Sequence, residues 1–126
     1  MGLTGVSSDM RDIDDAYDAG NPKAIVGRDM YYNRIKKFVG EYAAEMGGLD
    51  LLIFTGGVGE NSKDLREYVC KNMEFFGIEI DYAYNDTIRG RNAIISTPES
   101  KVKVAVIATN EELVIATDTY NLTKNL

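Results

Sequence analysis

A run of apolar residues followed by a cluster of glycines constrains this sequence more than any other feature. Residues 51–54 are apolar without alternation, and glycine occupies positions 56, 57 and 59. Such runs are typical of strands buried on both faces, as in a parallel sheet. Glycines after the strand allow a sharp turn and the close approach of a ligand. The pattern predicts a strand, a glycine turn and a helix that together hold a nucleotide, with an ordinary tight strand-to-helix connection as the alternative.

The composition indicates one soluble globular domain spanning residues 1–126. Apolar residues make up 44% of the chain and charged residues 27%. No apolar run approaches the ~18 residues of a membrane helix, no secretory pattern opens the chain, and a net charge of −6 argues against nucleic-acid binding. The single cysteine, Cys70, fits a reducing, cytoplasmic setting and is better interpreted as a buried structural thiol than as a nucleophile. The chain contains no histidine, which removes the commonest general base.

Helical spacing dominates the first third of the chain. Ser7 or Ser8 is expected to cap a short helix that runs through 9–19. Gly20-Asn21-Pro22 ends it and starts a second helix over 23–46. The apolar stripe predicted to face the core of that second helix consists of Tyr31, Ile35, Phe38, Tyr42 and Met46, widened by Ala24, Val39 and Ala43.

Short elements are predicted for the remainder. Asn61 or Ser62 caps a helix that reaches about residue 75 and places Leu65, Val69 and Met73 on one side. The expected elements that follow are a strand at 78–81, a surface loop at 82–92 with an exposed Arg89-Gly90-Arg91, strands at 93–96 and 101–107, and a final helix carrying Leu113, Ile115, Ala116 and Tyr120.

The junction after residue 107 carries a second chemical signal. Thr109 and Glu112 form a T-x-x-E capping box, which gives Glu112 a structural explanation. Glu111 has no such explanation and could hold Mg²⁺ beside a phosphate; an acidic residue favoured by the helix dipole is the alternative. If the two strands are parallel neighbours, the glycine turn and Glu111 flank one crevice.

Four segments of the sequence resemble the acetate kinase family, which belongs to the superfamily of acetate and sugar kinases, heat-shock proteins and actin. They are residues 5–12 (GVSSDMRD), 54–62 (FTGGVGENS), 94–98 (IISTP) and 106–113 (VIATNEEL). They keep the family's order and approximate separation and cover nearly the whole chain. The resemblance implies an α/β fold: the C-terminal portion of an actin-like (ribonuclease H-like) ATPase domain, with a small, mostly parallel or mixed sheet flanked by helices.

The resemblance also implies roles for individual residues. Asp9, Met10 and Arg11 match a segment that contacts the nucleotide near the adenosine. Residues 57–61, which are Gly57, Val58, Gly59, Glu60 and Asn61, match the glycine turn along the nucleotide, and Glu111 matches a magnesium-binding glutamate. Gly56 stands where the family usually has alanine and Ala108 where it usually has proline, and both departures are interpreted as conservative.

The functional expectation is therefore part of an enzyme. Family members transfer the γ-phosphoryl group of ATP to acetate, giving acetyl phosphate and ADP, and they are homodimers. The motifs for the first phosphate loop, the acetate pocket and the catalytic aspartate, histidine and arginine are absent here, so catalytic residues are expected in an N-terminal half outside this chain and the chain alone is expected to be inactive. The alternatives are a non-catalytic nucleotide-binding or dimerisation module and a part of a propionate or butyrate kinase.

Overall fold

The computed structural model of the chain describes residues 2–124, built around one three-stranded sheet. The elements in chain order are α1 (Met10–Asp18), α2 (Pro22–Met46), β1 (Leu51–Phe54), α3 (Gly56–Asn61), α4 (Lys63–Cys70), a 3₁₀ turn (Glu74–Phe76), α5 (Tyr82–Asp86), β2 (Ala93–Ile94), β3 (Lys103–Val106) and α6 (Glu111–Thr123). Within this described part, no helix combines the length and apolarity needed to cross a membrane.

The sheet has the order β1-β3-β2 and confirms the expected small mixed sheet. β1 runs parallel to β3, with Leu51 opposite Lys103 and Phe54 opposite Val106, whereas β2 is antiparallel to β3. Because β1 and β3 point in the same direction, their carboxyl ends lie at the same edge of the sheet. The two strand-to-helix junctions of the sequence are therefore neighbours in space.

One face of the sheet packs against α2 and α4 and forms the core. Phe54, Val104 and Val106 turn toward this face and are 5%, 0% and 0% exposed. Leu65 and Val69 of α4 meet them, as the helical spacing predicted. Full burial of each such side chain stabilises the fold by about 1.5–3 kcal/mol.

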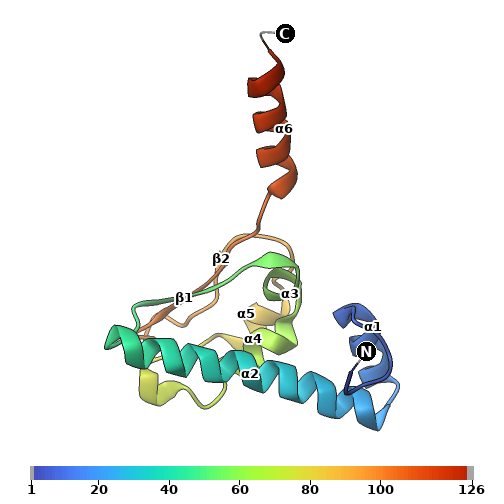
Figure 1. Cartoon of the computed structure of the whole chain (residues 1–126). Coiled ribbons are helices and arrows are strands. Elements are labelled where there is room, and N and C mark those ends of the chain that lie inside the picture. Colours follow the sequence, from blue (N-terminus) through green and yellow to red (C-terminus); the bar gives the residue numbers. More distant parts are fainter. Residues whose placement is uncertain (1, 125–126) are drawn as a thin grey trace.

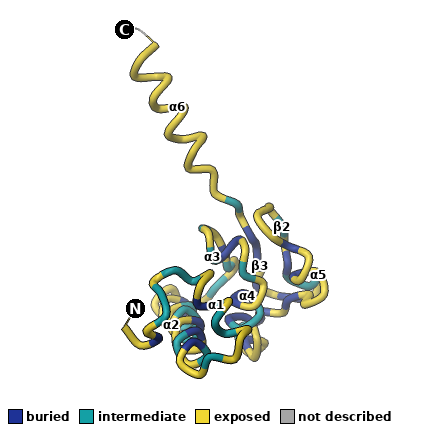
Figure 2. The backbone as a smooth tube through the Cα atoms, turned by 90° about the vertical axis from the view of Figure 1, so that its right-hand side faces the viewer, coloured by how far each residue is buried: buried dark blue, intermediate teal, exposed yellow. Residues whose placement is uncertain are grey.

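The opposite face of the sheet is open, and the prediction that residues 51–54 are covered on both faces is wrong. Leu51 and Ile53 of β1 are 46% and 44% exposed, and Ile94 of β2 is 56% exposed. The helix that could have covered them, α6, projects away from the body and is exposed along its described length (Figure 1 and Figure 2). The apolar run is typical of a strand buried on both faces, but in the described part of the chain helices cover only one face of the sheet.

Helix α2 confirms the predicted bounds closely, but its buried face is displaced from the predicted stripe. Its buried residues are Ala24, Arg28, Tyr32 and Ala43. Four members of the predicted core stripe are instead exposed: Tyr31, Phe38, Tyr42 and Met46. A helix this long carries more than one apolar stripe, and α1 and α4 pack against the stripe that contains Tyr32.

Three further local expectations were inaccurate. The helix expected to reach residue 75 ends at Cys70, although Met73 is buried as predicted. The strand expected at 78–81 is reduced to a single bridge between Ile80 and Ser96. The loop expected at 82–92 begins with the short helix α5, and the buried Asn85 of this helix together with Ile88 just after it attaches the segment to the core.

Candidate functional site

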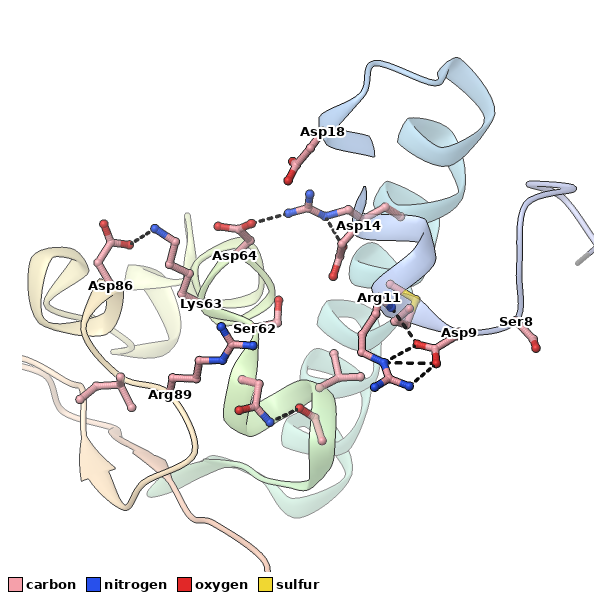
Figure 3. A pocket seen from close by; sticks show the side chains of 16 residues that line it. Ser8, Asp9, Arg11, Asp14, Asp18, Ser62, Lys63, Asp64, Asp86 and Arg89 are labelled. Carbon is pink, nitrogen blue, oxygen red and sulfur yellow. Dashed lines mark hydrogen bonds and ion pairs between the residues drawn. The ribbon is translucent and has the colours of Figure 1, made fainter. Parts of the chain in front are cut away.

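A large cleft lies between the N-terminal segment with α1 on one side and α3, α4 and the loop after α5 on the other (Figure 3). Its volume is about 1170 Å³. Six of the eight predicted nucleotide-binding residues line it: Asp9, Met10, Arg11, Gly57, Val58 and Asn61. These residues come from two segments that lie far apart in the sequence, so the cleft is created by the tertiary fold.

The first wall is set by the cap of α1. Asp9, rather than Ser7 or Ser8, is the N-cap, and its carboxylate accepts a hydrogen bond of 2.9 Å from the Arg11 backbone N–H. The same carboxylate forms an ion pair with the Arg11 guanidinium at 2.6 Å (Figure 3). The hydrogen bond from the Arg11 side chain is the main reason that the pKa of Asp9 falls to about 2. Asp9 therefore stays ionised near neutral pH and orients Arg11 at the cleft.

The second wall is the glycine segment, which is a short helix rather than a turn. Gly57 is exposed, and a Cβ added there would meet no atom within 4 Å. Asn61 donates a side-chain hydrogen bond of 2.8 Å to the carbonyl of Gly57, which fixes its amide at the cleft. The backbone of Gly56 has φ +70°, so an alanine at this position would be strained, and the sequence's departure from alanine is not neutral for the backbone.

Two predicted residues, Gly59 and Glu60, are not among the residues that line the cleft. A Cβ on Gly59 would lie 3.2 Å from the backbone of Phe54, so this glycine permits close packing of α3 on β1. The Glu60 carboxylate accepts hydrogen bonds from the Thr109 N–H at 2.7 Å and the Thr109 hydroxyl at 2.8 Å. These bonds to Thr109 hold the pKa of Glu60 below its usual range. Glu60 joins the two junctions instead of lining the cavity.

The predicted capping box at the start of α6 is wrong. Asn110 is the N-cap and accepts a hydrogen bond of 3.0 Å from the Leu113 N–H, whereas the Thr109 hydroxyl donates to Glu60. Glu111 lies in the first turn of α6 and is exposed, but it does not line the cleft. The structure thus brings the two junctions together without placing Glu111 in the same cavity as Gly57.

The residues present are compatible with Mg²⁺ bound together with a nucleotide. Within residues 2–124, no group of three or more His, Cys, Asp or Glu side chains could hold a metal ion by itself. Mg²⁺ in nucleotide sites is commonly held by one or two carboxylates together with phosphate oxygens and water. Glu111, the one carboxylate that the resemblance assigns to the metal, fits such a partial donor set.

Arg28 lines the cleft and was not recognised in the sequence as part of the site. Its guanidinium is bonded to Asp64 at 2.7 Å and paired with Asp14 at 3.3 Å, and it stacks on the Tyr17 ring at 3.9 Å. The side chain is only 7% exposed. Since two carboxylates neutralise it, Arg28 connects α1, α2 and α4 rather than offering a free positive charge to a ligand.

Arg89 also lines the cleft, and the sequence pattern had indicated only an exposed turn. It follows the buried Ile88, which is 1% exposed, and lies across the cleft from Arg11 in Figure 3. In the described part of the chain, no hydrogen bond or ion pair engages the Arg89 guanidinium. The one signal in the sequence was an apolar residue, Ile88, directly before the basic turn. Burial of Ile88 anchors the backbone that leads into Arg89.

Comparison with known proteins places the whole arrangement in one family. A sequence model described as "Acetokinase family" matches residues 1–117. The acetate kinase of Bacteroides thetaiotaomicron is 56% identical over 124 residues, which cover 98% of this chain and 31% of that protein. The acetate kinase of Porphyromonas gingivalis strain W83 is 55% identical over 98% of this chain and 31% of that protein. The chain therefore spans about 30% of the length of these relatives.

Comparison with solved structures also finds members of this family. The crystal structure of Porphyromonas gingivalis acetate kinase superposes with a TM-score of 0.86 at 55% identity, covering 95% of this chain and 30% of that one. The acetate kinase from Entamoeba histolytica gives 0.83 at 36% identity, covering 98% and 32%. A propionate kinase from Francisella tularensis gives 0.74 at 34% identity, covering 91% and 29%.

Proposed function

The chain belongs to the acetokinase family, and on that premise we propose that it forms the nucleotide-binding part of an acetate kinase. In a family-length protein it would hold ATP or ADP with Mg²⁺ while the γ-phosphoryl group passes reversibly between ATP and acetate, giving acetyl phosphate and ADP. The observation that carries this proposal is the convergence of Asp9, Met10, Arg11, Gly57, Val58 and Asn61 on one cleft.

Each wall of the cleft would contribute a different kind of contact. Arg11, oriented by Asp9, supplies a cation near the adenosine end. Gly57 allows the nucleotide to approach the backbone because no side chain intervenes, and Asn61 offers an amide fixed by its bond to the Gly57 carbonyl. These groups bind and orient the nucleotide, which is the main task of the protein in phosphoryl transfer.

Glu111 is proposed as the magnesium ligand of the same site. The ion, when bound, would neutralise charge on the phosphates. The Glu60–Thr109 bonds support this role, because they tie the backbone just before Glu111 to the glycine segment. A nucleotide that extends from the cleft past Gly57 toward the β3–α6 junction would bring its phosphates toward Glu111.

The catalytic groups are proposed to lie outside this segment, in the part of a family-length protein that the chain does not span. The described cleft offers positioning groups but no histidine, which the chain lacks entirely. The 126-residue chain by itself should therefore bind nucleotide without turning it over. A cytoplasmic location is proposed with it, supported by the reduced and buried thiol of Cys70.

Isothermal titration calorimetry tests the binding directly. ATP with Mg²⁺ is titrated into the 126-residue chain, and acetyl phosphate formation from ATP and acetate is assayed in parallel. Binding without turnover supports a nucleotide half-site. Absence of binding would contradict the proposed role for this cleft and leave an assembly role.

An assembly role has its own structural support. An apolar groove on α2 and the segment after it is lined by Ile35, Phe38, Val39, Tyr42, Met46, Leu49 and Leu52. Tyr42 and Met46 are 61% and 63% exposed. We propose this groove as part of the contact in a homodimer. Light scattering should give the mass of a dimer for the unmodified chain and of a monomer for Tyr42→Glu. A monomer mass for both proteins would contradict the proposed dimer contact.

Acetate is the proposed acyl substrate because the acetate kinase relatives have the higher identities. The structural similarity to a propionate kinase keeps propionate as the second candidate. Assays of a family-length protein with acetate, propionate and butyrate would distinguish them by the ratio of kcat/KM values.

A further inference from the structure

Arg66 is a fully buried cation that lies behind residues lining the cleft. Its side chain extends from α4 and is 0% exposed. The guanidinium donates to the Gly59 carbonyl at 2.9 Å and the Glu60 carbonyl at 3.1 Å. It also donates to the Asn85 side-chain oxygen at 2.7 Å and the Asn85 carbonyl at 3.3 Å, and to the Ile88 carbonyl at 2.7 Å. One side chain thus joins α3, α4, α5 and the loop after α5.

The partners of Arg66 distinguish it from an ordinary buried ion pair. Every hydrogen-bond acceptor of its guanidinium is a neutral oxygen, and burial lowers the pKa of Arg66. Arg28 shows the contrasting arrangement, since two carboxylates neutralise it. The planar fork of arginine can satisfy several carbonyls at fixed angles, which a lysine ammonium cannot do.

The carbonyls that Arg66 holds belong to peptide units that lead directly into the cleft. The Glu60 carbonyl precedes Asn61, and the Ile88 carbonyl precedes Arg89. Gly90 completes the link by donating its N–H to the Glu60 carbonyl at 3.2 Å. The Arg66 guanidinium and the Gly90–Glu60 bond therefore together connect the segment that carries Asn61 to the segment that carries Arg89.

We propose that Arg66 is a positioning residue that fixes the Ile88–Gly90 segment against the end of α3, and so presents Arg89 and Asn61 together to a nucleotide. Arg66 itself touches no ligand. The part of this inference that concerns affinity rests on the proposed nucleotide function, whereas the part that concerns the geometry of the wall does not.

The test compares Arg66→Lys with the unmodified chain by amide hydrogen exchange in the absence of ligand. The Gly90 N–H, bonded to Glu60, reports on the wall. The N–H groups of Ile95 and Ile107, bonded to Val104 and Phe54, report on the sheet. Positioning predicts that protection of Gly90 falls about tenfold further than protection of the sheet amides, which corresponds to one lost hydrogen bond to a buried carbonyl.

If Arg66 only stabilises the fold, protection should fall equally at all three amides. That result would overturn the proposal. Arg66→Met is the second variant, because it removes the cost of burying a charge and keeps much of the side-chain length. It should show the same selective loss at Gly90. Loss of all protection in both variants would also overturn the proposal, because Arg66 would then support the whole fold. Arg34→Lys, on the exposed side of α2, is the matched control.

Calorimetry with ADP and Mg²⁺ supplies the second readout. Arg66→Lys should raise the Kd about tenfold, and Arg34→Lys should leave it unchanged. If the unmodified chain binds no ADP, the proposed function fails while the exchange experiment still decides the geometric part. If the chain binds ADP and Arg66→Lys binds it equally well, the affinity part of the inference is wrong.

Discussion

The Glu60 carboxylate accepts two hydrogen bonds from Thr109, at 2.7 Å from its N–H and 2.8 Å from its hydroxyl. Forty-nine residues separate the two in the sequence. The contact couples the glycine segment after β1 to the junction after β3, where Glu111 begins α6. The Glu60 carboxylate is therefore engaged within the protein, and the contact of this residue with the nucleotide stays a prediction.

Glu60 should make stability depend on pH in a defined direction. Its folded-state pKa is lowered, so the stabilisation is fully present above the unfolded-state value of about 4.3 and is lost as the pH falls through the folded-state pKa. The unmodified chain should be more stable than Glu60→Gln at pH 7, and this difference should shrink toward pH 3. Urea unfolding at a series of pH values measures it. Glu99→Gln, an exposed control, should show no such trend; a pH-independent difference for Glu60→Gln would refute the assignment.

Substitution by alanine should affect nucleotide affinity at Gly57 and stability at Gly59. Gly57→Ala adds a methyl group into open space, so folding should be unaffected while nucleotide affinity falls about tenfold through overpacking against the ligand. Gly59→Ala places its Cβ 3.2 Å from Phe54 and should lower stability by about 1–3 kcal/mol. Thermal unfolding and calorimetry on both variants separate the effects. A similar loss of stability in both would show that Gly57 is structural.

Asp9→Asn should separate helix capping from the orientation of Arg11. Asparagine is also a good N-cap, so α1 should persist by circular dichroism. The ion pair to Arg11 is lost, and nucleotide affinity should fall several-fold because the guanidinium is no longer held. Asp15→Asn on the exposed side of α1 is the control. Unchanged affinity in Asp9→Asn would remove Arg11 from the site.

Glu111 and Glu112 should differ in their effect on magnesium. In a family-length protein, Glu111→Ala should raise the Mg²⁺ concentration required for half-maximal activity much more than Glu112→Ala. Both side chains are exposed in the first turn of α6, so any helix-dipole contribution is shared and cancels in the comparison. Equal and small effects would exclude Glu111 as the ligand.

Cys70 should be inert in the folded chain. The side chain is 2% exposed, and burial raises its pKa to about 12, so almost no thiolate is present at pH 8. A thiol-specific reagent should therefore label it only as fast as the protein opens, and labelling should accelerate with urea. Rapid stoichiometric labelling without denaturant would show that the residue is accessible.

Several features of the fold followed from the sequence because they depend on local physics. The apolar run at 51–54 and the alternating-to-apolar run before Ile107 formed strands, and α2 extends between Asn21 as its cap and Gly47 as its left-handed end. Helical spacing also placed Leu65, Val69 and Met73 in the core. The resemblance identified the segments that converge on the cleft. The parallel pairing of β1 with β3, which the sequence offered only as a condition, is present in the sheet.

Other features were decided by the tertiary structure alone. Whether α2 buries Tyr32 or Phe38 depends on where α1 and α4 pack, and spacing along one helix does not contain that information. The roles of Glu60 and Arg66 depend on partners 49 and up to 22 residues away, and their chemistry permits either a ligand or a backbone carbonyl as the partner. A sequence records which hydrogen-bonding groups exist, but only the folded chain determines which of them meet.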